Sequence, residues 1–184
     1  MSKIRFGIIG CGMIGSLVAE MLKVYDLEVL AFDPFMSPEK AEKLGVTPCS
    51  LEEIFSTCSV VSNHLANNAQ TVGMLHYDLF RRMRENAVFI NTGRGAQVVE
   101  ADLTRILRER PDLTALLDVT WPEPPEEGHP FYTLPNCLLT PHIAGSAGDE
   151  VARMGEYMLA ECQAYLKGEP CNYAVSAKML ETMA

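Results

Sequence analysis

The chain has 184 residues, of which 48% are hydrophobic and 21% charged, a balance that suits one globular domain with a sizeable core. Its formal net charge of −9 makes it a poor generic partner for nucleic-acid phosphates or anionic lipid, so we expect neither nucleic-acid nor membrane partners. The sequence enters an apolar run at once, without a signal peptide or membrane span, and we therefore expect a cytoplasmic protein.

The first half of the chain alternates short apolar runs with amphipathic stretches, the pattern of βαβ units. Residues 4–9 form an apolar run that predicts a strand, and residues 17–22 follow with helical spacing of their apolar side chains. Residues 28–32 predict the second strand. Ser50 and Glu53 have the spacing of a capping box and predict the start of a short helix.

The second half continues the same alternation. In chain order we expect a strand at 59–62, a helix at 77–83, a strand at 87–90, a helix at 101–110, strands at 113–117 and 137–139, and a helix at 150–167 that Gly168 and Pro170 end. The strands are apolar at consecutive positions, as strands buried on both faces are. The sequence therefore predicts an α/β fold with a doubly wound, mostly parallel sheet. Residues 120–136, rich in proline and glutamate, form the longest irregular stretch, and such a loop is usually functional or mobile.

The six cysteines are scattered over predicted strands, helices and loops and form no CxxC pair. In a chain with a core of this size, that spacing favours reduced, buried thiols over a disulfide framework. We expect no metal site.

A glycine-rich loop follows the first strand with the sequence Gly10-Cys11-Gly12-Met13-Ile14-Gly15. This GxGxxG sequence opens a helix, and Asp33 ends the next strand, which is the context of a dinucleotide-binding fingerprint in a three-layer Rossmann-type α/β/α fold. Gly12 would let backbone amides approach a pyrophosphate at the helix N-terminus. Asp33 would accept hydrogen bonds from the ribose hydroxyls and repel a 2′-phosphate, so we expect NAD rather than NADP. A tight turn beside a surface acid, or a methyltransferase-type glycine loop, are the alternatives.

Polar or glycine residues follow each predicted strand, and in a parallel sheet these positions meet at one edge, where ligands bind. The third strand leads to His64, the fourth to Arg94, the fifth to Asp118 and the last to His142. This convergence points to chemistry beside the cofactor. Each residue also has a structural reading: a surface charge for Arg94, a turn for Asp118, a helix cap for His142, and an undecided role for His64.

Several stretches together resemble the D-2-hydroxyacid dehydrogenases. The resemblance runs from about residue 4 to about residue 166. The stretches are the 10–15 loop, Asn91-Thr92-Gly93-Arg94-Gly95, Asp118-Val119 with Glu123-Pro124, and Leu139-Thr140-Pro141-His142-Ile143-Ala144-Gly145.

The resemblance implies roles for individual residues. Arg94 would hold the substrate's carboxylate and carbonyl oxygen, and His142 would pass a proton to or from the substrate oxygen while hydride moves to or from NAD. Glu123 would pair with His142 and favour its protonated form, although pattern alone does not choose among Glu123, Glu126 and Glu127. Asp118 would contact the nicotinamide side. The implied catalytic residues are Arg94, Glu123 and His142, and the implied cofactor-binding residues are Gly10, Gly12, Met13, Ile14, Gly15, Asp33, His64, Leu65, Thr92, Gly93, Arg94, Asp118, His142 and Gly145.

Two features depart from the family pattern. The family commonly has a proline and a threonine soon after the position of His64, where this chain has Leu65-Ala66-Asn67-Asn68. Family members also carry a substrate domain built partly from sequence before the glycine loop, which here begins at residue 10. We therefore expect an NAD-binding Rossmann domain over residues 1–168 and a tail over residues 169–184, a remnant of the return to a missing substrate domain.

The resemblance favours the coenzyme domain of an NAD-dependent D-2-hydroxyacid dehydrogenase, weakly active or inactive without its lid. A non-catalytic NAD-binding or interaction module is the alternative, and a methyltransferase a less favoured third. The substrate would be a small 2-hydroxy or 2-keto acid, whose identity the sequence leaves open. A homodimer is expected, since a lidless domain exposes apolar surface.

Overall fold

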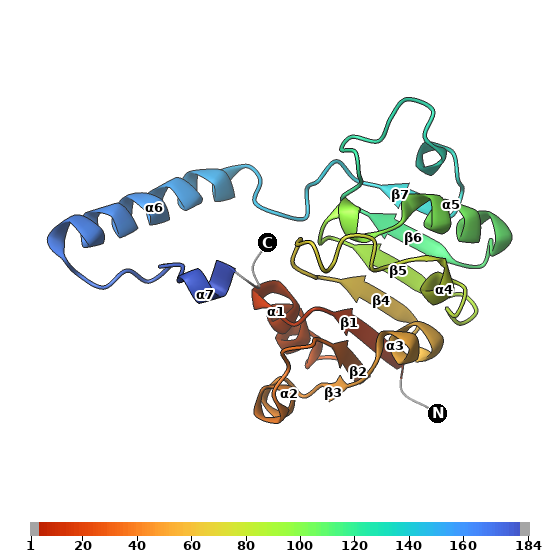
Figure 1. Cartoon of the computed structure of the whole chain (residues 1–184), viewed down its shortest axis with the longest axis horizontal. Coiled ribbons are helices and arrows are strands. Elements are labelled where there is room, and N and C mark those ends of the chain that lie inside the picture. Colours follow the sequence, from red (N-terminus) through yellow and green to blue (C-terminus); the bar gives the residue numbers. More distant parts are fainter. Residues whose placement is uncertain (1–3, 181–184) are drawn as a thin grey trace.

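The protein forms a seven-stranded sheet in which every neighbouring pair of strands is parallel (Figure 1). The computed structural model describes residues 4–180. The sheet order is β3-β2-β1-β4-β5-β6-β7. The strands are β1 (Ile4–Ile9), β2 (Leu27–Phe32), β3 (Thr47–Pro48), β4 (Val60–Asn63), β5 (Val88–Asn91), β6 (Thr114–Leu117) and β7 (Cys137–Leu139). Because β2 and β4 flank β1 on opposite sides, the chain reverses its direction of travel at β1, which is the switch point of a doubly wound sheet.

Helices cover both faces of the sheet, so the predicted three-layer α/β/α architecture is confirmed. The helices are α1 (Met13–Leu22), α2 (Pro38–Leu44), α3 (Leu51–Thr57), α4 (Tyr77–Phe80), α5 (Glu100–Glu109), α6 (Asp149–Lys167) and α7 (Ala177–Leu180), with 3₁₀ turns η1 (Gly95–Gln97) and η2 (Pro130–Tyr132).

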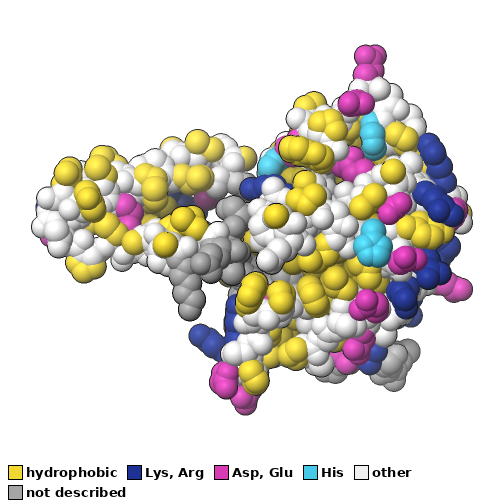
Figure 2. Space-filling view, viewed as in Figure 1, with side chains coloured by type: hydrophobic (Ala, Val, Ile, Leu, Met, Phe, Trp, Pro, Cys, Tyr) yellow, Lys and Arg dark blue, Asp and Glu magenta, His cyan; other side chains and the backbone are white. Residues whose placement is uncertain are grey.

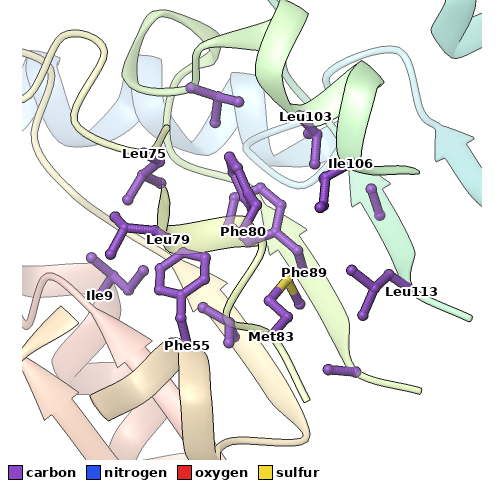
Figure 3. Packing of buried hydrophobic residues seen from close by; sticks show 14 of the residues in the cluster. Ile9, Phe55, Leu75, Leu79, Phe80, Met83, Phe89, Leu103, Ile106 and Leu113 are labelled. Carbon is purple, nitrogen blue, oxygen red and sulfur yellow. The ribbon is translucent and has the colours of Figure 1, made fainter. Parts of the chain in front are cut away.

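The two faces of the sheet carry separate hydrophobic clusters. Ile8 and Ile9 are both fully buried, yet Ile8 belongs to the cluster that includes residues of α1 and α2, and Ile9 to the cluster that includes residues of α3, α4 and α5. Consecutive strand residues point to opposite faces of the sheet. In the larger cluster, the rings of Phe55, Phe80 and Phe89 meet edge to face or stacked, with centroids 5.0 to 6.4 Å apart (Figure 3).

The expected elements are all present, and most boundaries differ by no more than one residue, although α1 begins four residues before the helical spacing expected at 17–22. The helix expected at 77–83 ends at Phe80 and continues as a turn. Ser50 caps α3 as predicted, since its hydroxyl oxygen accepts a hydrogen bond from the Glu53 amide at 3.2 Å. The short elements α2, β3 and α7 were not expected from the sequence; α2 nevertheless has a cap at Ser37 and ends at the left-handed Gly45.

The helix α6 projects away from the sheet, and none of its residues is buried (Figure 1). Apolar side chains gather over this arm in the space-filling view (Figure 2). Among them are Val151, Met154, Met158, Leu159, Tyr165 and Leu166. The arm starts and ends where the sequence indicates, with Gly168 left-handed at its C-terminus, but it does not cover the sheet.

All six cysteines are free thiols. The expectation that they are buried is confirmed for Cys11 and Cys58 and wrong for Cys162, which lies exposed on α6, while the other three are partly buried. Burial raises the pKa of Cys11 and Cys58 to about 11 and that of Cys137 to about 12, so these thiols stay protonated and unreactive at neutral pH. No helix within residues 4–180 is long and apolar enough to cross a membrane.

Replacing Gly15 with alanine should destabilise the fold. A Cβ atom at Gly15 would overlap the carbonyl oxygen of Gly10, where α1 crosses the end of β1. We expect Gly15→Ala to lower the free energy of unfolding by about 1–3 kcal/mol, or roughly 5 °C in the midpoint of thermal unfolding. Gly155→Ala is the matched control, because Gly155 lies inside a helix with open space around its Cβ position. Equal midpoints for both variants would contradict the close approach of α1 to β1.

Candidate active site

The glycine loop lies at the carboxyl edge of the sheet, between β1 and α1. The amide of Gly10 donates to the carbonyl oxygen of Phe32 at 2.8 Å, and its φ of 84° is left-handed, which favours glycine. A Cβ at Gly10 would lie 2.8 Å from the carbonyl oxygen of His64, so the loop packs tightly against the residues after β4. At Gly12, in contrast, a Cβ would meet nothing within 4 Å. The first helical turn of α1 therefore begins beside open space, as an approach to an anion requires.

The carboxylate of Asp33 is fixed at the end of β2 by two backbone amides. One oxygen accepts from Cys11 and the other from Phe35, both at 2.8 Å. The first of these bonds ties the acid directly to the glycine loop. Lys40 approaches the same loop from α2 and donates to the carbonyl oxygen of Cys11.

A cleft of about 460 Å³ opens above this edge of the sheet. Ten of the implied cofactor-binding residues line it: Gly10, Gly12, Met13, Ile14, Asp33, His64, Leu65, Thr92, Gly93 and Arg94. Sequence reasoning missed Phe35, Asn68, Gln70, Thr71, Met74 and Met179, which also line it, because nothing in their local pattern marks them as polar ends of strands. The implied residues Gly15, Asp118, Glu123, His142 and Gly145 lie outside this lining.

His64 is partly buried in the wall of the cleft. Its ring is held on both sides by hydroxyl groups, with Nε2 2.9 Å from Ser62 Oγ and Nδ1 3.5 Å from Thr92 Oγ1. Burial lowers the pKa of His64 to about 4, so the imidazole is neutral at physiological pH. A neutral ring adds no charge to the cleft and can both donate and accept a hydrogen bond.

Arg94 lies on the loop between β5 and η1 (residues 92–94, called the arginine loop below), with its side chain exposed at the cleft. Its Nη1 donates to the carbonyl oxygen of Gly93 at 2.7 Å. The end of this loop lies very close to the backbone of Thr120, since a Cβ at Gly95 would overlap it. This contact places the start of the 120–136 loop directly against the arginine loop.

The carboxylate of Asp118 organises the segment that carries His142. It accepts hydrogen bonds from the Thr140 hydroxyl and from the amides of Ile143 and Ala144, the last two at 2.9 Å. Burial alone would raise the pKa of Asp118, but these donors outweigh it and hold the pKa below its usual range. Asp118 is therefore a stable anion that orders residues 140–144.

His142 and Glu123 form a close pair at this end of the sheet. The distance from His142 Nδ1 to Glu123 Oε1 is 2.6 Å. The pairing distinguishes Glu123 from Glu126 and Glu127, which the sequence alone did not separate. Both side chains are exposed, at 43% for His142 and 39% for Glu123, and His142 has a left-handed φ of 52°. Glu100 holds the start of the 120–136 loop, because its carboxylate accepts a hydrogen bond from the Trp121 amide at 2.7 Å.

A buried amide cluster under the cleft was also missed. Asn63, Asn91 and Gln97 are each at most 1% exposed, and the Asn63 side chain donates hydrogen bonds to the other two. Asn63 and Asn91 stand at strand ends, where polar residues were expected, but Gln97 lies six residues after β5 and carried no local signal.

Comparison with known proteins identifies the chain's relatives. The family model of the D-isomer specific 2-hydroxyacid dehydrogenase, NAD binding domain, matches residues 1–144. D-3-phosphoglycerate dehydrogenase from Archaeoglobus fulgidus is 32% identical over 175 residues, which are 95% of this chain and 33% of that protein. This chain thus spans about a third of that relative's length.

Solved structures agree with the family model. The NAD-complexed form of a D-isomer specific 2-hydroxyacid dehydrogenase from Lactobacillus delbrueckii ssp. bulgaricus matches with a TM-score of 0.82 at 26% identity, covering 94% of this chain and 56% of that one. A D-isomer specific 2-hydroxyacid dehydrogenase from Xanthobacter autotrophicus Py2, in complex with NADPH and MES, matches with a TM-score of 0.78 at 27% identity, covering 96% and 72%. Through the NAD-binding domain that residues 1–144 match, this chain belongs to the D-isomer specific 2-hydroxyacid dehydrogenase family.

Proposed function

We propose that this chain binds NAD in the cleft at the carboxyl edge of the sheet and is the coenzyme domain of an oxidoreductase acting on a D-2-hydroxy acid or its 2-keto acid. The observation that carries the proposal is the pairing of His142 with Glu123 at 2.6 Å on the same sheet edge as a glycine-lined cleft. A tight turn or a methyltransferase-type loop would require neither the histidine–carboxylate pair nor Arg94 at the cleft.

The residues of the cleft fit a dinucleotide. Gly12 leaves room for a pyrophosphate that a side chain would fill, and the backbone amides of the first turn of α1 are the donors that an anion requires. Asp33, fixed by the amides of Cys11 and Phe35, suits the hydroxyls of a ribose and opposes a 2′-phosphate. We therefore propose NAD rather than NADP as the cofactor.

In this proposal NAD, when bound, supplies or accepts the hydride, and the protein binds the acid and moves a proton. Among the described residues that line the cleft, Arg94 is the one that carries a guanidinium, and it holds the substrate's carboxylate in a forked, charge-assisted contact. His142 gives a proton to the substrate's carbonyl oxygen, or takes one from the hydroxyl, with Glu123 orienting the ring through Nδ1. Asp118 holds the segment of His142 in place through Thr140, Ile143 and Ala144.

We further propose that residues 1–168 act as the NAD-binding unit, that residues 169–184 are a tail, and that the chain turns over poorly without a domain that closes over the cleft. The exposure of His142 and Glu123 supports this, because water weakens the electrostatic effect of an open site. Of these ranges, residues 1–3 and 181–184 lie outside the described residues. The alternative is a non-catalytic NAD-binding or interaction module. Under either function we propose a cytoplasmic location.

Replacing Gly12 with valine should weaken cofactor binding without unfolding the protein. The new side chain would enter the open space beside the first turn of α1, and the φ of −66° at Gly12 suits any residue. We expect Gly12→Val to lower the NADH affinity at least about tenfold by isothermal titration and to leave the unfolding midpoint unchanged. We expect the wild-type chain to bind NADH more tightly than NADPH. Gly155→Val is the control for a glycine in open space away from the cleft. Equal NADH affinity in both variants would contradict the proposed site, and binding of S-adenosylmethionine instead of NADH would favour the methyltransferase alternative.

Replacing His142 with glutamine should remove turnover and leave cofactor binding intact. The loss of a general acid–base group is expected to lower the rate of NADH oxidation by about 10²–10⁴-fold with a panel of 2-keto acids. His129→Gln is a control, because His129 lies on the 120–136 loop and contacts Glu100 rather than Glu123.

A wild-type rate equal to that of complete dehydrogenases would contradict the need for closure. Absence of turnover, together with a biological activity that survives Arg94→Ala and His142→Ala, would favour the binding module.

We also propose that the protein is a homodimer. The apolar face of α6, including Met154 and Met158, lies exposed in the single chain and would be covered by association. Light scattering at micromolar concentration is expected to give twice the 20.3 kDa mass of the chain. A monodisperse species of the single-chain mass would refute the dimer.

A further inference from the structure

Three side-chain amides form a buried cluster beneath the cleft. Asn63 ends β4, Asn91 ends β5 and Gln97 ends η1, and their exposed fractions are 0%, 1% and 0%. The Asn63 side-chain nitrogen donates to Asn91 Oδ1 at 2.9 Å and to Gln97 Oε1 at 2.6 Å. Gly93 packs against this cluster, since a Cβ there would lie 2.9 Å from both Asn63 Nδ2 and Gln97 Oε1.

Gln97 joins two loops that are about thirty residues apart in the sequence. Its Oε1 accepts from the backbone amide of Arg94 at 3.2 Å. Its Nε2 donates to the carbonyl oxygen of Leu65 at 2.8 Å and to that of Ala66 at 3.0 Å. One planar amide therefore fixes the backbone of the arginine loop relative to the backbone of the loop after β4.

The two asparagines complete the same arrangement on either side. Asn91 accepts from the Gly93 amide at 3.1 Å and donates to the Arg94 carbonyl oxygen at 3.2 Å, so both peptide groups of the arginine loop are held. Asn63 accepts from the Leu65 amide at 3.3 Å. The side chains of the cluster form hydrogen bonds with backbone groups of the cleft wall. These backbone groups lie beyond the ends of β4 and β5, where the hydrogen bonding of the sheet has stopped.

The orientation of the Arg94 side chain depends on this backbone. The guanidinium is exposed, and the carbonyl oxygen of its own neighbour Gly93 accepts from Nη1. A forked contact with a carboxylate requires the guanidinium to lie within about 0.5 Å of the productive geometry. Because the side chain itself is exposed, its position must be set by the backbone that carries it.

We propose that Gln97 is a positioning residue that sets Arg94 against the cofactor side of the cleft. This inference rests on the proposed function and adds to it the residue that couples the acid-binding loop to the loop of Leu65 and Ala66. These two residues belong to the stretch in which the chain departs from the family pattern, and their carbonyl groups are the ones that Gln97 holds. Gln97 is not a catalytic residue, because it acts through the backbone.

The first test uses Gln97→Met in the full chain, with Thr104→Val as the control for replacing a buried polar side chain, on α5. Hydrogen exchange of the ligand-free proteins is the readout. Gln97→Met is expected to speed exchange at least tenfold at the Arg94 amide, which loses its acceptor, and at the Leu65 amide, whose acceptor Asn63 loses its own bond to Gln97 Oε1. Thr104→Val is expected to speed exchange at neither amide. Faster exchange in only one loop, or in neither, would overturn the coupling.

The second test measures ligand binding by titration, at a temperature where both variants are folded by circular dichroism. NADH is titrated first, and then oxamate, a non-reacting mimic of a 2-keto acid, into the NADH-loaded chain. We expect Gln97→Met to weaken oxamate binding at least tenfold and NADH binding by no more than about threefold, with Thr104→Val unchanged in both. A wild-type chain that binds no NADH would refute the proposed function. A wild-type chain that binds both ligands, with oxamate binding unaltered in Gln97→Met, would refute the role of Gln97 alone.

Discussion

The structure depends on one close approach, where α1 leaves the sheet over the end of β1. Gly15 lies so near the carbonyl oxygen of Gly10 that a Cβ has no room, and Gly10 itself fits against the backbone of His64. This approach brings the N-terminus of α1 to the carboxyl edge of β1 and β4, the switch point of the sheet. The helix terminus, the end of β2 with Asp33 and the end of β4 with His64 therefore surround one space, and the glycine that faces it, Gly12, leaves that space open.

Much of the fold could be predicted because strands buried on both faces are apolar at consecutive positions. β1 and β5 are recognisable for that reason, and the cap at Ser50 has its own short signal. β3, with two residues, is too short to show any periodicity. The position of α6 was also outside the reach of the sequence, because an amphipathic helix shows that it has an apolar face but not which surface meets it.

The sequence indicates those residues of the candidate site that lie at the carboxyl ends of strands. A parallel sheet brings its carboxyl ends together, so His64, Arg94 and Asp118 could be assigned to one edge from the alternation of elements alone. What local pattern does not contain is the partner of each group. The choice of Glu123 for His142, and the link from Gln97 to Leu65, are contacts over 19 and 32 residues, and they became visible only when the chain was folded.

The polar edge of the sheet divides into two parts that differ in their contact with water. On one side, Asn63, Asn91 and Gln97 are buried and fully engaged in hydrogen bonds, so the wall of the cleft is rigid before any ligand arrives. On the other side, His142 and Glu123 form their pair in solvent, outside the lining of the cleft. Preorganisation of the cleft favours binding, whereas the proton transfer proposed for His142 is favoured where water is excluded. In the proposed function, cofactor binding and proton transfer are therefore separable: the first would need only groups that the described residues already hold in place, and the second would need a surface that closes over His142.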